Sequence, residues 1–154
     1  MAYQKNEVKM KIKGSSQELT KKYYRMEFIG AGVYNQIASQ IEKKNPSLAE
    51  RLRKVAKDEH KHGMMFGKFY QKQYGKKYSK GIWIFIGKMI ARLIYPMPLE
   101  KKIMKFSQAE CDAVRELDRV FRTGEKQGDP FLKCLKAIYP DELDHSKVYG
   151  EFYS

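Results

Sequence analysis

The residues of this sequence best suited to chemistry are glutamates and histidines that recur at a fixed spacing. Glu27 is followed by an Asp-Glu-x-x-His motif at residues 58–62, and Glu110 by a second such motif at residues 141–145. Each ligand of the first unit lies 83 positions before its counterpart (110 − 27, 142 − 59 and 145 − 62). Four carboxylates and two imidazoles, arranged as two equivalent halves, make the ligand set of a two-iron site inside a four-helix bundle. The candidate metal ligands are Glu27, Glu59, His62, Glu110, Glu142 and His145.

The spacing within each motif allows both of its ligands to reach one metal. Residues i and i+3 of a helix share a face, so Glu59 and His62 point the same way, as do Glu142 and His145. Glu27 lies on a helix face that otherwise resembles core, where an unpaired ionised carboxylate costs several kcal/mol. Divalent cations relieve that cost and keep the carboxylates deprotonated. We therefore expect two iron ions, as an Fe–O–Fe pair or with manganese in one position, because carboxylate and imidazole suit both metals.

Other residues near the ligands are candidates for supporting roles. Ligating histidines usually donate their second ring nitrogen to a carboxylate, and Asp58 and Asp141 are placed to accept it, each from the opposite half. Gly30 and Ala31 lie one turn beyond the first glutamate, where they leave room for oxygen, peroxide or a substrate. Tyr34 has two interpretations: a core aromatic, or a catalytic side chain that hydrogen-bonds a bound oxygen species or carries a radical.

Apolar residues at intervals of three and four predict the helices that must position these side chains. The first helix begins at a capping box over residues 15–18 and ends at the Asn-Pro pair at 45–46. The second begins at another capping box, over residues 47–50, and runs to about residue 74. Their short link predicts an antiparallel hairpin. On the second helix His60 faces away from the metal side, so we expect it on the surface.

The second half of the chain repeats this arrangement. One helix runs from about Leu99 to Arg122. The next begins at Asp129-Pro130, which suit the N-cap and the first helical residue. Pro140 lies inside this last helix and is expected to kink or break it just before the site.

A strongly apolar segment at residues 82–95 separates the two hairpins. The order of hairpin, long apolar crossover and hairpin predicts an all-α, ferritin-like four-helix bundle with the crossover between its second and third helices. The segment is too short, and too interrupted by Lys88 and Arg92, to span a bilayer. Two alternatives remain: an interfacial helix on a membrane surface, anchored by Trp83 and flanking lysines, or a helix packed on the bundle or at a dimer interface.

Length and composition limit the number of domains, the partners and the cellular compartment. A chain of 154 residues suits one domain, at 15–154, preceded by a flexible basic arm at 1–14. The net charge of +13 arises from lysines scattered in pairs through helical segments, which is typical of a solvated face and argues against nucleic acid as a partner. Cys111 and Cys134 are too few for a disulfide framework, no CxxC pair is present, and nothing resembles a signal peptide. The expected compartment is the cytoplasm, with peripheral membrane contact if residues 82–95 are interfacial.

Residues 27–38, the two Asp-Glu-x-x-His motifs and Glu110 resemble those of the ferritin-like di-iron carboxylate proteins. The resemblance covers roughly residues 16–152 and is nearest to the rubrerythrin and demethoxyubiquinone hydroxylase branches. It implies that the six candidate ligands bind iron, with Glu59 and Glu110 as the bridging pair, and that the chemistry involves oxygen or peroxide. Rubrerythrins are similar but carry a further glutamate where this chain has Ala113, and commonly a rubredoxin domain. The six-ligand set looks more like the hydroxylase branch, whose apolar crossover contacts the membrane to reach a quinone.

The expected function is therefore that of a di-iron oxidoreductase: an oxidase, hydroxylase or peroxide reductase. Two ferrous ions would reduce O2 or peroxide, with an electron donor that the sequence does not identify, and the chain is expected to form a homodimer. One alternative is a ferritin-like iron-binding or storage protein without an organic substrate. Another is a basic helical bundle that associates with a membrane or nucleic acid.

Overall fold

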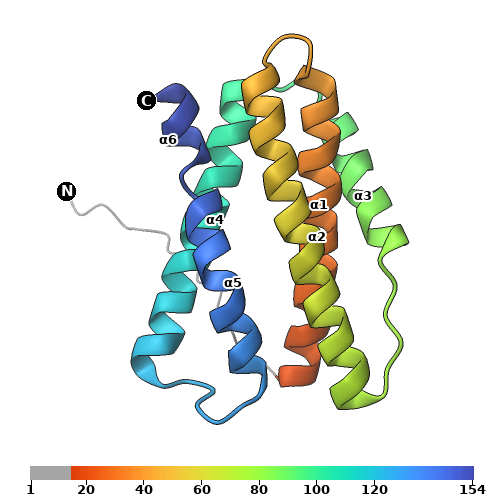
Figure 1. The fold of residues 1–154 in the computed structure, drawn as a ribbon, viewed down its shortest axis with the longest axis vertical. Helices are drawn as coiled ribbons and strands as arrows, with labels where there is room; N and C mark the ends of the chain where they lie inside the picture. The colour runs from red at the N-terminus through yellow and green to blue at the C-terminus, as the bar shows by residue number, and fades with distance from the viewer. Residues whose placement is uncertain (1–14) are drawn as a thin grey trace, which may run out of the picture.

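A computed structural model describes residues 15–154 as an assembly of helices (Figure 1), and the predicted arm at 1–14 lies outside the described residues. No strand occurs in the described part of the chain. The helices are α1 (Ser16–Ile41), α2 (Pro46–Tyr74), α3 (Gly81–Leu93), α4 (Leu99–Thr123), α5 (Phe131–His145) and α6 (Val148–Tyr153).

The first hairpin is formed by α1 and α2, as predicted. The hydroxyl of Ser15 accepts a hydrogen bond from the backbone N–H of Glu18 at 3.3 Å and so caps α1. The capping box predicted at residues 47–50 is wrong, because α2 already begins at Pro46. Asn45 is the N-cap, and its Oδ1 accepts from the N–H of Leu48 at 3.2 Å. Proline suits the first helical position, where its missing N–H costs nothing, so the helix begins earlier than the serine alone suggests.

The second hairpin is formed by α4 and α5, and both ends of α4 and the start of α5 lie within one residue of those predicted. Asp129 Oδ1 accepts a hydrogen bond from the N–H of Phe131 at 2.9 Å, where α5 begins. The predicted break before the site is wrong: α5 continues through Pro140 and ends only at His145. The residue whose carbonyl loses its donor, Lys136, is exposed, so water can satisfy that oxygen.

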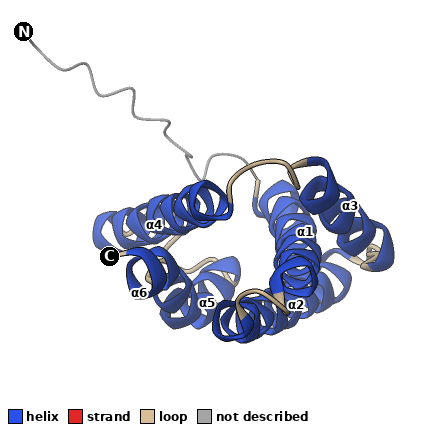
Figure 2. Ribbon diagram, turned by 90° about the horizontal axis from the view of Figure 1, so that it is seen from above, coloured by secondary structure: helices blue, strands red, loops and turns tan. Residues whose placement is uncertain are grey.

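Residues 75–98 connect α2 to α4 and contain α3, which lies on the side of α1 away from α4 and α5 (Figure 2). Two glycines bring α1 and α3 into backbone contact. A Cβ on Gly32 would lie 2.1 Å from the carbonyl oxygen of Ile84, and a Cβ on Gly87 would lie 2.0 Å from that of Ile29. Only glycine allows so close an approach at these two positions. One face of α3 therefore packs on the bundle.

The opposite face of α3 is apolar and exposed. Phe85 is 55% and Leu93 is 76% exposed, and Ile82 and Met89 lie on the same helix with large exposed fractions. In the part of the chain that the structure describes, no helix combines the length and the apolarity needed to cross a membrane. This outer face of α3 is defined by Ile82, Phe85, Met89 and Leu93.

Two separate hydrophobic clusters form the core, and the predicted ligands lie between them. One cluster includes Ile37, Leu52 and Ile103, and the other includes Phe28, Phe66, Leu117 and Leu135. On α2 and α4 the ligand residues fall between the residues that belong to the two clusters, and on α1 Glu27 lies next to Phe28, where the second cluster gives way to the first. Because apolar side chains close the space on both sides, the glutamates and histidines are held in a polar layer near the middle of the bundle.

Candidate metal centre

The structure brings all six predicted ligands together from four helices. Glu27 comes from α1 and Glu110 from α4, while the two Glu-x-x-His pairs come from α2 and α5. Five of the six are buried, with exposed fractions of 7% or less, and Glu110 is half-buried. Buried carboxylates in this number are rare without partners, because each ionised group loses its hydration.

The ligand atoms form two groups of four, each with its atoms within 4.8 Å of one another. The first group consists of Glu27, Glu59, His62 and Glu142, and the second of Glu59, Glu110, Glu142 and His145.

The two groups therefore share Glu59 and Glu142. This differs from the bridging pair of Glu59 and Glu110 that the resemblance implied, since Glu110 belongs to one group alone. The repeat explains the difference. Glu59 and Glu142 occupy equivalent positions in the two halves, as do Glu27 and Glu110. A pair shared equally between two related sites must be made of equivalent residues.

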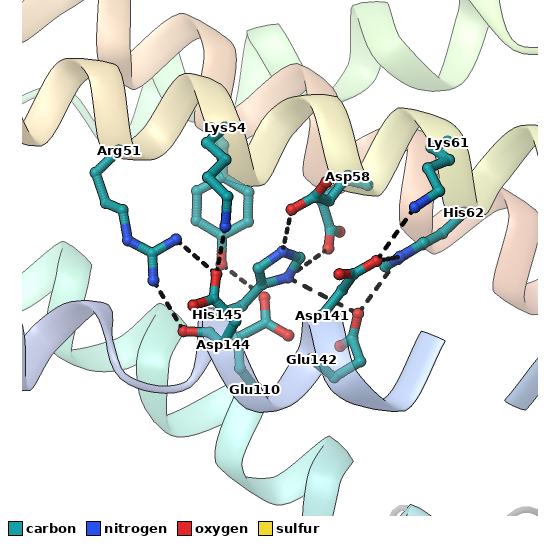
Figure 3. A network of polar contacts seen from close by, with 12 residues as sticks. Arg51, Lys54, Asp58, Lys61, His62, Glu110, Asp141, Glu142, Asp144 and His145 are labelled. Atoms are coloured by element: carbon teal, nitrogen blue, oxygen red, sulfur yellow. Dashed lines mark hydrogen bonds and ion pairs between the residues drawn. The ribbon is translucent and has the colours of Figure 1, made fainter. Parts of the chain in front are cut away.

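Each histidine is oriented by an aspartate from the opposite half, as predicted. Nε2 of His62 lies 2.8 Å from Oδ2 of Asp141, and Nε2 of His145 lies 3.2 Å from Oδ2 of Asp58. Figure 3 shows Asp58 reaching from α2 toward His145, and Asp141 reaching from α5 toward His62. When Nε2 carries the proton that the aspartate accepts, Nδ1 keeps a free lone pair. Both aspartates therefore select the tautomer that a metal requires.

The Nδ1 atoms of both histidines face the glutamates. His62 Nδ1 lies 3.3 Å from Glu27 Oε2 and 3.4 Å from Glu142 Oε1. His145 Nδ1 lies 3.2 Å from Glu59 Oε1 and makes no hydrogen bond to any described residue. The Oε1 atoms of Glu59 and Glu142 are likewise buried without a hydrogen-bond partner among the described residues. Such buried lone pairs are costly unless a cation accepts them. The donor set fits divalent metal ions, which prefer this mixture of carboxylate and imidazole.

The pKa values of the four glutamates in the metal-free site reflect their burial and how closely their carboxyl groups lie. Burial raises the pKa of Glu27, Glu59 and Glu142 above the ordinary carboxyl value. Burial and then the charge of Glu142 raise the pKa of Glu110 to about 8. Four carboxyl groups cannot all ionise at this separation without a counter-charge. Two divalent cations supply that counter-charge in full.

The two histidines respond differently to their surroundings. For His62, burial lowers the pKa, but the neighbouring carboxylates of Glu142, Glu27 and Asp141 outweigh it and raise the pKa to about 11. For His145, burial dominates and the pKa falls below its ordinary value.

Tyr34 faces the site. Its hydroxyl donates a hydrogen bond to Glu110 Oε1 at 2.7 Å, and its ring packs edge-on against Phe106 with centroids 5.6 Å apart. Burial and the neighbouring glutamates, Glu110 first, raise the pKa of Tyr34 well above the ordinary value. The hydroxyl is therefore a proton donor that fixes the position of one glutamate. A catalytic role for it stays a prediction.

The other residues singled out in the sequence have mixed outcomes. A Cβ on Gly30 would lie 2.3 Å from Glu59 Oε2, so this glycine makes room for the Glu59 carboxylate, and room for oxygen, peroxide or a substrate stays a prediction. A cavity lies beside the site, between α1 and α4. Ala31 is buried but does not line that cavity. His60 is half-buried rather than on the surface, and its ring packs edge-on against Phe28 with centroids 5.6 Å apart. The aromatic core of the bundle extends further around α2 than the three- and four-residue spacing predicts.

Sequence reasoning missed an ion-pair network beside His145. Arg51 Nη1 and Lys54 Nζ, both from α2, each lie 2.8 Å from Asp144 Oδ2 on α5 (Figure 3). Arg51 Nε also contacts Glu151 of α6 at 2.9 Å. Asp144 is the fourth residue of its motif in the sequence, but the neighbouring residues do not indicate which basic side chain it contacts.

The fold and site define a class: a helical bundle with a buried carboxylate–histidine cluster suited to metal. The family model described as Rubrerythrin matches residues 18–153, so the chain belongs to the rubrerythrin family, within the ferritin-like di-iron superfamily. No curated protein and no solved structure gives a significant match to the chain.

Proposed function

We propose that this protein is a di-iron oxidoreductase that reacts with O2 or peroxide. The observation that carries the proposal is the pair of four-residue groups that share Glu59 and Glu142 and leave buried lone pairs facing one another. Membership of the rubrerythrin family supports it, because that family includes oxidoreductases. In this proposal the connection over residues 75–98 serves as the crossover of a ferritin-like bundle.

Six side chains would hold the two ions. Glu27 and His62 would hold one, Glu110 and His145 would hold the other, and Glu59 and Glu142 belong to both groups. When bound, two irons, or iron with manganese, would supply electrons and act as Lewis acids toward oxygen or peroxide.

The surrounding residues perform the tasks that the chain itself must do. Asp58 and Asp141 keep the Nδ1 lone pairs aimed at the ions. Tyr34 holds the carboxylate of Glu110 and has a proton to donate at its hydroxyl. The two hydrophobic clusters exclude water from both ends of the layer.

The test is an anaerobic titration of metal-free protein with Fe(II), followed by O2 or peroxide and optical spectroscopy. We expect two irons per chain and the absorption bands of an oxo-bridged ferric pair after oxidation. Glu27→Ala and Glu110→Ala should each lower the iron content, whereas Glu50→Ala, at an exposed position of α2, should not. No iron uptake, or full uptake in both ligand variants, contradicts the proposal. Many irons per chain in a large shell would favour iron storage instead.

A partner is also proposed for the exposed face of α3. We propose that a second copy of the chain covers this face and forms a homodimer, because the face is apolar and its helix is firmly seated on α1. Light scattering should give the mass of a dimer, and Phe85→Lys should give a monomer with unchanged helix content. Co-sedimentation with anionic vesicles that Phe85→Lys abolishes, together with a monomeric mass, would assign the face to a membrane surface instead.

A further inference from the structure

A cavity of about 460 Å³ lies between α1 and α4 and ends at the candidate metal centre. Its inner end is formed by the four ligand glutamates: Glu27, Glu59, Glu110 and Glu142. Its walls are mainly apolar and include Met26, Ile29, Val33, Phe106, Ala113 and Leu117. The cavity is thus continuous with the ligand carboxylates on one side and with apolar side chains on the others.

The size of the cavity exceeds what oxygen or peroxide needs. One water molecule takes up roughly 30 Å³ of liquid, and a diatomic oxygen species is of similar size. Sites for small organic molecules span ≈ 300–1,000 Å³, and this cavity falls within that range. Small side chains on α4 create the space, since Ala109 and Ala113 lie one turn apart on the wall.

The chemistry of the walls restricts the charge of a ligand. The hydroxyl of Tyr34 already donates to Glu110, and the charged wall residues outside the ligand set, Lys22 and Asp112, are exposed at the rim. Two divalent ions balance the four carboxylates, so the loaded inner end carries no net charge. No buried wall residue therefore offers a counter-charge to an ion, and burying an unpaired charge there is expensive.

The exposed residues of the cavity lining mark its opening and lie on α1 (Lys22, Met26), α4 (Ala109, Asp112) and α3 (Ile90). Met26 of α1 is 43% exposed and Ile90 of α3 is 37% exposed, and both line the cavity. An apolar molecule that enters between Met26 and Ile90 would pass side chains that are also apolar. The buried Oε1 atoms of Glu59 and Glu142, which lack a hydrogen-bond partner among the described residues, mark the end at which it would meet the ions.

We infer that this cavity binds an uncharged, mainly apolar organic molecule as the substrate of the metal centre, an inference that rests on the proposed di-iron function. The ligand lies against the walls formed by α1 and α4, with one end beside the shared glutamates. The cavity gives the centre a substrate larger than oxygen or peroxide, and a wall residue such as Ala113 limits the size of that substrate.

The experiment uses N-phenyl-1-naphthylamine, a neutral apolar fluorophore, with the full chain loaded anaerobically with Fe(II). We expect a saturable rise in emission at about one equivalent per chain. Ala113→Phe fills the wall and should weaken binding at least tenfold, and Ala109→Phe, at an exposed rim position, serves as the second variant if the first fails to fold. Ala137→Phe is the matched control, because Ala137 is exposed on α5 and does not line the cavity.

Iron content separates this inference from the proposed function. Full iron content with no saturable binding of the fluorophore overturns the inference and leaves the di-iron function standing. Binding that survives Ala113→Phe and Ala109→Phe but is lost in Phe85→Lys also overturns it, because the fluorophore then lies on the exposed face of α3. Binding that is lost only in the cavity variants, with iron content unchanged, supports the inference. A wild-type protein that takes up no iron contradicts the proposed function, whatever the fluorophore does.

Discussion

The two halves of the molecule carry the same ligands but hold them in different ways. On α2, a helix of 29 residues, Glu59 and His62 lie in the interior, with more than two further turns after them. On α5, a helix of 15 residues, Glu142 and His145 lie in the last turn. Carbonyls at a helix end lack the partners that the interior has, so a last turn frays more readily. A long helix positions its own ligands, whereas the short one needs help from its neighbours.

That help comes from α2. Arg51 and Lys54 bind Asp144, and Asp58 binds His145, so three side chains of α2 hold the last turn of α5. In return Asp141 of α5 contacts His62, which lies in the interior of α2. The two halves therefore carry the same candidate ligands at the same spacing but differ in the contacts that hold those ligands in place. The long helix of the first half positions its own ligands, and side chains of the same helix hold the ligands of the second half in place.

The largest effect should separate shared from unshared ligands. Glu59→Gln and Glu142→Gln each remove a charge that both groups use, so we expect both irons to be lost. Glu27→Gln and Glu110→Gln each affect one group and should leave about one iron per chain. Iron per chain after anaerobic gel filtration measures the difference. One iron retained in Glu59→Gln would show that the groups are not joined through this residue.

Next in size are the aspartates that orient the histidines. Loss of such a partner typically weakens metal binding ~10–100-fold. Asp141→Asn removes the shorter contact, 2.8 Å against 3.2 Å for Asp58→Asn, so we expect the larger loss for Asp141. Competition with a chelator for Fe(II) gives the affinities, with Glu50→Gln as a surface control. Equal affinities in wild type and both variants would mean that the histidines are oriented by packing alone.

The packing of the first hairpin can be weakened at its contact with α3. Gly87→Ala places a methyl group on the carbonyl of Ile29, and overpacking of this kind costs ~1–3 kcal/mol. Gly81→Ala on the same helix meets nothing within 4 Å and should change the free energy of unfolding little. Urea denaturation of the two variants measures both. Similar stabilities would show that α1 and α3 can move apart without cost.

The metal-free protein should also lose stability as the pH rises. Glu110 has a pKa raised to about 8 in the fold, from a model-compound value of 4.5, so the folded state retains a proton that the unfolded state releases. The stabilisation is complete below about 4.5 and is lost as the pH rises toward 8. The melting temperature should fall over this window, less so in Glu110→Gln. It should not fall in iron-loaded protein, and a rising melting temperature in the metal-free protein would contradict the prediction.

Much of this architecture could be predicted because it depends on local patterns. The 83-residue repeat predicted the six candidate ligands that the structure brings together, and the i, i+3 spacing put each Glu-x-x-His pair on one face. The crossed contacts of Asp58 and Asp141 also followed from the repeat, since each histidine needs a carboxylate that its own helix turn cannot supply. The error at Ser47 arose because two adjacent capping signals competed, and Pro46 favoured the earlier one. The error at Pro140 arose because a helix tolerates proline where water can reach the freed carbonyl.

The sequence alone predicted which side chains are candidate ligands, which helices carry them and where most helices begin and end. These properties depend on residues a few positions apart. Only the tertiary structure decided that Glu59 and Glu142 are the shared pair, that Arg51 fastens Asp144, and that a cavity between α1 and α4 reaches the site. Each of these depends on the distance between helices far apart in the chain. That distance is set by how the side chains of each pair of helices pack against one another. For α1 and α3 it is set by Gly32 and Gly87, which allow the two backbones to touch.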